Sequence, residues 1–277
     1  MKEKDFVRVV YQYYKKHGRD RLPWRFPALK INKKGDIDPY AILVSEVMLQ
    51  QTQVDRVIPK YQAFMKKFPT VEKLAQSKLD SVLTLWSGLG YNRRAKFLKR
   101  AAEKIAHEYN GKFPRNRAAI DDLPGVGEYT AGAICAFAFN LPELFLETNI
   151  RSVYIHHFFP GRNDVHDKEL LPLLEKTVDK KKPREWYAAL MDYGAHIKSQ
   201  TINPNRRSTN HKRQPKFSGS LREVRGKILK YMVENGFLAT TMVSFIESDG
   251  EKAKEAIEGL LSDGLIRVAA KGFRLSS

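Results

Sequence analysis

The stretch Leu123-Pro-Gly-Val-Gly127, followed by Glu128-Tyr-Thr-Ala-Gly-Ala133, places a glycine-rich turn directly before an apolar helical segment. Gly125 and Gly127 can adopt positive φ, so the turn can offer successive backbone N–H groups to an anion at close range. The helix after it adds unpaired first-turn N–H groups and the positive end of its dipole. An ordinary turn between two helices is the alternative. The predicted anion-binding residues are Leu123, Gly125, Val126 and Gly127.

The composition favours a polyanionic partner. The chain has 277 residues, with 49 Lys and Arg against 31 Asp and Glu and a formal net charge of +18. Nucleic acid is the expected partner. No stretch approaches the ~20 apolar residues of a membrane-spanning helix, and no signal peptide is recognisable. We therefore expect an intracellular protein, cytoplasmic and nucleoid-associated in a prokaryote. We also expect a monomer. Cys135 is the only cysteine, which excludes a disulfide, a zinc–thiolate site or a four-cysteine cluster within one chain.

Apolar residues recur at helical spacing through the first two thirds of the chain, which predicts an all-α domain and argues against a Rossmann-type sheet. Its expected helices are 6–16, 39–51, 54–68, 71–76, 79–85, 93–109, 116–122, 130–139, 149–159, 168–177 and 183–195.

The C-terminal quarter has a different pattern. The segment 198–216 is basic and contains no acidic residue, which indicates a linker. Expected helices 221–234, 240–247 and 250–262 and strands 265–269 and 272–275 predict a small α+β winged helix. The helix 250–262 has mixed charge, so it is expected either to bind DNA or to have a structural or protein-docking role. The predicted domains are 1–197, with a central lobe at about 42–131, a basic linker 198–219 and a winged-helix-like domain 220–277.

Four short motifs together resemble the helix-hairpin-helix DNA glycosylases, particularly the MutY-type adenine DNA glycosylases. They are Leu-Pro-Trp-Arg at 22–25, Asp-Pro-Tyr at 38–40 with Ser-Glu-Val-Met-Leu-Gln-Gln-Thr-Gln-Val at 45–54, Trp-Ser-Gly-Leu-Gly-Tyr at 86–91, and the hairpin. The resemblance implies a mainly α, two-lobed fold that binds mismatched or damaged double-stranded DNA.

The resemblance also implies catalytic roles. Glu46 corresponds to the family's general acid, which protonates the departing adenine; alone it would be interpreted as a surface helix residue. Glu147 occupies the position of the family's Asp, which stabilises the cationic sugar, and its extra methylene adds about 1.5 Å of reach. The alternative for Glu147 is an acid at a helix N-terminus. Asn149 would support a neighbouring hydrogen bond.

Tyr129 stands where bifunctional relatives carry the Schiff-base Lys, which implies a monofunctional glycosylase that leaves an abasic site. Gln51 and Tyr91 resemble wedge residues that enter the DNA stack, although Tyr91 can equally pack beneath its loop. Trp24, Arg25 and Leu49 resemble base-pocket residues, with Trp24 alternatively a core anchor. The chain inserts residues 26–36 beside this pocket.

Two family features are missing. The four cysteines of an iron–sulfur cluster are absent after Met191-Asp-Tyr-Gly-Ala195, so we expect no cofactor and no metal. Lys198, Arg206 and Arg207 of the basic segment are predicted to contact DNA in its place, or to form a solvated tether. The segment after the predicted linker is too short for the family's large 8-oxoguanine-recognition domain, so we expect that domain to be absent.

The resemblance of the catalytic motifs makes removal of adenine opposite 8-oxoguanine or guanine the leading expectation. Removal of mismatched thymine or uracil, or of a modified base, and damage binding without catalysis are the alternatives.

Overall fold

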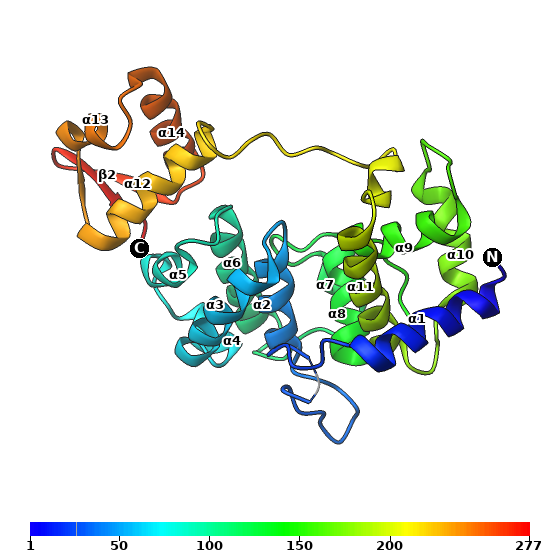
Figure 1. Ribbon diagram of the computed structural model, residues 1–277. Coiled ribbons are helices and arrows are strands. Elements are labelled where there is room, and N and C mark those ends of the chain that lie inside the picture. Colours follow the sequence, from blue (N-terminus) through cyan, green and yellow to red (C-terminus); the bar gives the residue numbers. More distant parts are fainter. Residues whose placement is uncertain (26) are drawn as a thin grey trace. The chain divides into compact units, whose positions relative to one another are not determined.

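The computed structural model describes residues 1–25 and 27–277 (Figure 1). Phe26, the first residue of the predicted insertion, lies outside the described residues. Contacts divide the chain into two compact units. Unit 1 comprises Met1–Glu46, Arg115–Asp122 and Val126–Arg213, and unit 2 comprises Val47–Pro114, Leu123–Gly125 and Gln214–Ser277. No helix among the described residues combines the length and apolarity needed to cross a membrane.

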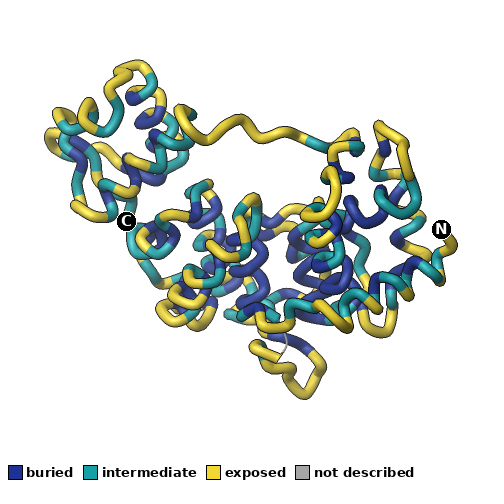
Figure 2. Tube along the Cα trace, viewed as in Figure 1, coloured by how far each residue is buried: buried dark blue, intermediate teal, exposed yellow. Residues whose placement is uncertain are grey.

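Unit 1 is built around α8 (Glu128–Phe139), in which every residue from Thr130 to Phe139 is buried (Figure 2). A helix that is apolar on all sides is stable only when other elements surround it. The helix α11 packs on α8, α9 and α1. The other elements of unit 1 are α1 (Glu3–His17), residues 39–46 of α2 (Pro39–Leu49), α7 (Arg117–Asp121), α9 (Thr148–Phe158), α10 (Asp167–Thr177), α11 (Pro183–Gln200) and the 3₁₀ helix η1 (Pro204–Arg207).

The helices α9 and α11 approach each other closely at Gly194. A Cβ atom at this position would lie 2.3 Å from the backbone oxygen of Asn149. Only glycine therefore allows the two helices to pack in this way. This contact matters for the site because Glu147 precedes α9, whereas Asp192 lies on α11.

Unit 2 contains a helical part and a small sheet. Its helical part has α3 (Val54–Lys67), α4 (Val71–Ala75), α5 (Leu79–Trp86) and α6 (Arg93–Glu108), and the C-terminal part has α12 (Leu221–Asn235), β1 (Leu238–Ala239), the 3₁₀ helix η2 (Thr240–Met242), α13 (Val243–Ile246), α14 (Gly250–Ser262), β2 (Ile266–Ala269) and β3 (Gly272–Leu275). The strand order is β1-β3-β2, and both pairings are antiparallel.

The helices and the β2–β3 hairpin agree with the sequence expectation, with two differences. The strand β1 was not predicted, because two residues are too short to show alternation. The segment expected as one helix at 240–247 is divided between η2 and α13. This arrangement of helices and antiparallel strands is compatible with a winged helix, which stays a prediction.

The segment predicted as a basic linker is partly ordered. The helix α11 continues to Gln200, η1 packs on α9, and Ser208 pairs with Val165 in an isolated bridge. The guanidinium of Arg207 donates to the backbone oxygens of Phe159 and Ile155 near the end of α9, at 2.5 and 3.4 Å. An arginine at a helix C-terminus satisfies carbonyls that the helix leaves unpaired. The domain boundaries expected from the sequence stay predictions.

Replacement of Gly194 by alanine is expected to destabilise unit 1. The added methyl group would overlap a backbone carbonyl of α9, which cannot move without shifting that helix, so the expected cost is about 1–3 kcal/mol. Thermal unfolding followed by circular dichroism measures it. Gly226 of α12 is the control, because a Cβ there meets nothing within 4 Å, and Gly226→Ala should leave stability unchanged or raise it by up to about 1 kcal/mol. Equal melting temperatures for the two variants would contradict the packing argument.

Candidate active site

Glu46 is buried in unit 1, with 5% of its surface exposed. It lies on α2, where every residue from Ala41 to Met48 is buried and the neighbours of Glu46 are apolar, with the exception of Ser45. The alternative of a surface helix residue is therefore wrong. The pKa of Glu46 is raised from 4.5 to about 7: burial is the largest cause and the charge of Glu147 contributes, whereas the hydrogen bond from Tyr129 acts in the opposite direction. A carboxyl group with this pKa is half-protonated near neutral pH and can act as a general acid.

Tyr129 is the direct partner of Glu46. Its hydroxyl donates to Oε2 of Glu46 at 2.8 Å. The Tyr129 ring packs edge-on against Phe145 at 5.8 Å, and Phe145 stacks on Tyr187 at 4.0 Å. Burial, together with the charges of Glu46 and Glu147, raises the pKa of Tyr129 well above its usual value. The aromatic packing therefore holds a protonated phenol against the carboxyl group.

Glu147 is the N-cap of α9. Its Oε1 accepts the backbone N–H groups of Asn149 and Ile150 at 2.7 and 2.9 Å, and its Oε2 accepts the Asn149 side-chain amide at 3.2 Å. The longer side chain thus folds back onto the start of its own helix, where the dipole favours negative charge. This geometry matches the alternative interpretation of Glu147 as an acidic residue at the N-terminus of a helix. Glu147 nevertheless lies close enough to Glu46 and Tyr129 to raise the pKa of both groups.

An ion pair that the sequence interpretation missed lies beside this cluster. Arg25 donates to both oxygens of Asp192 at 2.7 and 2.8 Å, and Arg19 adds a bond from its Nε at 2.7 Å. Asp192 is 2% exposed. Burial opposes its ionisation, but the bonds from Arg25 and Arg19 hold its pKa below the usual range. The sequence signal for this ion pair is the Met-Asp-Tyr-Gly-Ala motif at 191–195, which contains Asp192.

Of the three predicted base-pocket residues, Trp24 and Arg25 belong to unit 1 and Leu49 belongs to unit 2. Trp24 is buried and lines a cavity of about 500 Å³ in unit 1 with Arg25 and Ile42. Neither Glu46 nor Tyr129 lines this cavity. Arg25 directs its guanidinium at Asp192, and Leu49 ends α2 within unit 2. These assignments stay predictions.

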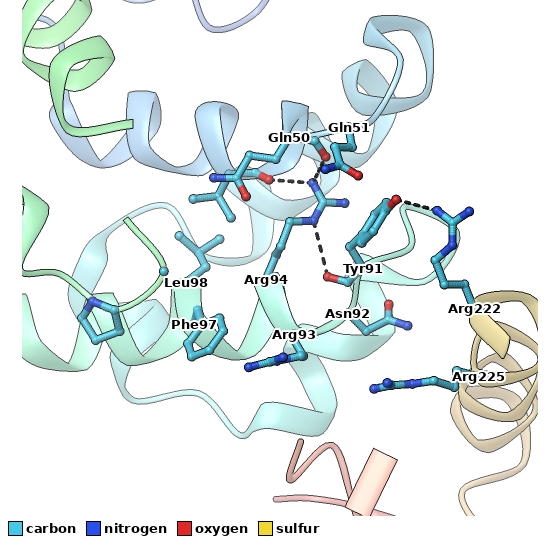
Figure 3. Close-up of a pocket in the computed structure, with 13 residues that line it drawn as sticks. Gln50, Gln51, Tyr91, Asn92, Arg93, Arg94, Phe97, Leu98, Arg222 and Arg225 are labelled. Atoms are coloured by element: carbon cyan, nitrogen blue, oxygen red, sulfur yellow. Dashed lines mark hydrogen bonds between the residues drawn. The ribbon is translucent and has the colours of Figure 1, made fainter. Parts of the chain in front are cut away.

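The predicted wedge residues Gln51 and Tyr91 lie together in unit 2 and line one cavity of about 510 Å³ (Figure 3). Both are exposed and adopt positive φ, at 54° and 48°. The alternative of Tyr91 packed beneath its loop is wrong, since 37% of its surface is exposed. Strained, exposed side chains of this kind are often found at ligand-binding sites.

Arg94 fixes these wedge residues in place, and the sequence interpretation missed it. This buried arginine donates to the backbone oxygens of Val47 and Met48 at 2.8 and 3.0 Å. It also donates to the backbone oxygen of Gln50 at 2.6 Å (Figure 3). Its guanidinium lies 5.4 Å from the Tyr91 ring centroid. Arg94 therefore caps the end of α2 and braces Tyr91. An arginine in a run of basic residues gives no sequence signal for such a role.

The hairpin glycines differ in conformation. Gly125 has φ +77°, and a Cβ there would lie 2.5 Å from Cβ of Phe97. Gly127 is the N-cap of α8 with φ −116°, so the expected positive φ is wrong for this residue; an extended N-cap is what the start of a helix requires. A Cβ at Gly127 meets nothing within 4 Å. Leu123 and Val126 bury their side chains, and anion binding by the hairpin backbone stays a prediction.

The predicted DNA-binding residues of the basic segment have separate environments. Arg206 is exposed, whereas Arg207 is partly buried against α9. Lys198 lies on α11, where burial lowers its pKa while the charge of Glu147 raises it. Lys198 is therefore an electrostatic neighbour of the carboxylate cluster rather than part of a flexible tether.

The donor set does not fit an iron–sulfur cluster. Such clusters are held by four cysteine thiolates, and the chain has one cysteine. Cys135 is buried on α8, and burial raises the pKa of its thiol to about 11. Among the described residues, no group of three or more His, Cys, Asp or Glu side chains could hold a metal ion.

Comparison with known proteins identifies the family. The profile described as HhH-GPD superfamily base excision DNA repair protein matches residues 44–195. The adenine DNA glycosylase of Mycolicibacterium smegmatis is 33% identical over 280 residues, which cover 92% of this chain and 91% of that protein. This chain belongs to the HhH-GPD superfamily and, within it, to the adenine DNA glycosylase family.

Other members of the superfamily are also similar. The adenine DNA glycosylase of Buchnera aphidicola subsp. Baizongia pistaciae is 41% identical over 196 residues, which cover 69% of this chain. The chain spans about half the length of that relative, 52%. A solved structure of a thermostable thymine-DNA glycosylase superposes with a TM-score of 0.58 at 30% identity, covering 70% of this chain and 86% of that one.

Glu46→Gln is expected to stabilise the protein at neutral pH. The folded-state pKa of Glu46 lies above 4.5, so its protonated form contributes to the free energy of unfolding. This contribution is fully present below pH 4.5 and is lost as the pH rises through about 7. Glutamine does not ionise, so the variant should gain up to about 3 kcal/mol relative to the unsubstituted protein above pH 7. Denaturant unfolding at several pH values measures the difference.

The control for the loss of one charge is Glu175→Gln, at an exposed position of α10. The difference in unfolding free energy between Glu175→Gln and the unsubstituted protein should not increase between pH 4.5 and 7. An increase of the same size in both variants would contradict a specific cost of ionising Glu46.

Proposed function

We propose that this protein is a monofunctional DNA glycosylase that removes adenine mispaired with 8-oxoguanine or guanine in double-stranded DNA and leaves an abasic site. The observation that carries the proposal is the buried Glu46, with a pKa of about 7, bonded to the Tyr129 hydroxyl. The relatives named adenine DNA glycosylase support adenine as the base. The protein would act as a monomer, without a metal or an iron–sulfur cluster.

The chemistry requires one proton donor and one fixed negative charge. Protonated Glu46 would donate its proton to a ring nitrogen of the flipped adenine, and the N-glycosidic bond electrons would leave with the base. The sugar would then carry oxocarbenium character. The Glu147 carboxylate, held by two backbone N–H groups of α9, would stabilise this positive charge. Water would add to the sugar carbon and lose a proton to solvent.

Tyr129 would restrict the reaction to base removal. A phenol cannot form an imine with the sugar, so no covalent link analogous to that of a lysine enzyme would arise. The Tyr129 hydroxyl would instead orient the Glu46 carboxyl group through the 2.8 Å bond. DNA would bind through the hairpin backbone at Gly125 and Gly127. Of Gln51 and Tyr91, one would fill the space left by the extruded nucleotide and the other would intercalate near the opposite base.

Two alternatives have specific support. The 30% identity to a thermostable thymine-DNA glycosylase favours a mismatch thymine or uracil glycosylase. The capping geometry of Glu147 favours a DNA-damage-binding protein without catalysis. Single-lesion duplexes, treated with alkali to cleave abasic sites, distinguish the three. Release of adenine alone supports the proposal, release of thymine or uracil supports the first alternative, and release of no base from any duplex supports the second.

Glu46→Gln is expected to lower the rate of adenine release about 10²–10⁴-fold, the usual effect of removing a general acid. Single-turnover assays on an A·8-oxoguanine duplex measure the rate. Glu175→Gln again serves as the control and should retain the full rate. Because Glu46→Gln should be the more stable protein at neutral pH, a loss of rate cannot be attributed to unfolding. A full rate in Glu46→Gln would refute the proposed role.

The rate of base release should fall as the pH rises above about 7, because only protonated Glu46 supplies the proton. Tyr129→Phe removes the hydrogen bond that lowers the Glu46 pKa, so the falling limb of its profile should move to higher pH. Single-turnover rates at saturating enzyme across pH measure both curves. A falling limb at the same pH in both proteins would contradict the coupling between the two side chains.

A further inference from the structure

The C-terminal part of unit 2 holds the two predicted wedge residues. The side-chain amide of Gln214 donates to the Tyr91 hydroxyl at 2.5 Å and also to Oε1 of Gln51. Arg222, in the first turn of α12, donates to the same hydroxyl at 2.5 Å (Figure 3). The Arg222 guanidinium lies 5.5 Å from the Tyr91 ring centroid, within cation–π range. The side chains of the two predicted wedge residues are therefore bonded to residues of the C-terminal part.

The cavity at this place is cationic. Four arginines and no acidic residue line it, and Pro124 and Gly125 of the hairpin line it as well. Three of the arginines are already engaged. Arg94 donates to backbone oxygens at the end of α2, while Arg93 and Arg225 both pair with Asp263.

Arg222 differs from these three in its partners. Its donors reach the Tyr91 hydroxyl and, at 2.8 Å, the backbone oxygen of Pro215. It makes no salt bridge with any carboxylate of the described residues. A phosphate carries negative charge and can accept two parallel bonds from one guanidinium, whereas the Tyr91 hydroxyl is neutral and offers a single oxygen. A phosphate group that enters the cavity would therefore be a better partner for Arg222 than a hydroxyl group.

The helix α14 offers no comparable surface. In a helix-turn-helix arrangement the later helix commonly faces DNA. Here α14 carries Glu251, Glu255 and Glu258 beside Lys252 and Lys254, so its charges largely cancel. The cationic cavity beside the wedge is thus the better DNA contact of the C-terminal part.

We propose that α12 of the C-terminal domain is part of the DNA-binding surface, with Arg222 binding a backbone phosphate of the strand that Tyr91 and Gln51 enter. This inference rests on the proposed function. On binding, Arg222 exchanges the Tyr91 hydroxyl for the phosphate, and Tyr91 loses one of the two bonds that hold its hydroxyl. The contact is independent of sequence, because a phosphate carries no base identity.

The test is the salt dependence of DNA binding by Arg222→Gln. The protein carries Glu46→Gln in addition, so that the DNA stays intact, and the probes are a duplex with one A·G mismatch and the same duplex fully paired. The loss of one phosphate contact should lower the slope of log affinity against log salt by about 0.9 and weaken binding several-fold. Fluorescence anisotropy at several salt concentrations measures the slope.

The matched control is Lys230→Gln, which removes the same charge from an exposed position on the same helix. Its slope should equal that of the parent protein. Arg222→Lys should also keep the parent slope, because the ammonium still binds phosphate. If Arg222 only supported Tyr91 structurally, both Arg222 variants would weaken binding without changing the slope. That result, or equal slopes for Arg222→Gln and Lys230→Gln, would overturn the proposal.

The two proposals fail separately. Base release by the protein with Glu46 intact tests the function, whereas the slopes require no reaction. Normal base release with an unchanged slope for Arg222→Gln would refute the role of α12 alone. A reduced slope without any base release would refute the glycosylase function and leave α12 as a DNA contact. Melting temperatures of all variants confirm that each remains folded.

Discussion

The chemistry of this protein depends on the burial of one carboxyl group in an apolar helix. Glu46 lies among apolar residues of α2 and is almost inaccessible to solvent. Desolvation penalises its charged form and raises its pKa to about 7. The hydrogen bond from Tyr129 limits the increase, so the group is not locked in the neutral state. A proton can therefore be held and released near neutral pH.

The same burial destabilises the protein at neutral pH. An ionised carboxylate in this position has few groups that compensate for the lost water. The fold maintains the arrangement because α8, α9 and α11 form a closely packed core, in which Gly194 leaves no room for a Cβ atom beside Asn149. The Arg25–Asp192 pair adds a fixed ionic group beside Glu46. A strained functional group supported by a rigid core is a common arrangement in enzymes.

In unit 2, polar contacts hold the predicted wedge residues Gln51 and Tyr91. Gln51 and Tyr91 have positive φ and exposed side chains, so neither is held by a hydrophobic core. Arg94 donates to the backbone oxygen of Gln50, next to Gln51. Gln214 and Arg222 donate to the side-chain hydroxyl of Tyr91. The first set of bonds is buried and structural. The second set is exposed to solvent.

The helical fold and the family could be predicted from the sequence, because helical periodicity and short motifs are local properties. The same motifs predicted Glu46, Tyr129, Glu147, Gln51 and Tyr91 as site residues, and their roles stay predictions. The sequence could not determine which of these side chains meet. The bond from Tyr129 to Glu46 joins residues 83 positions apart, and the Arg25–Asp192 pair joins residues 167 apart. Burial, and with it the pKa of Glu46, depends on neighbours brought together by packing. The tertiary structure alone therefore decided the environment of each group, and with it the chemistry that the group can perform.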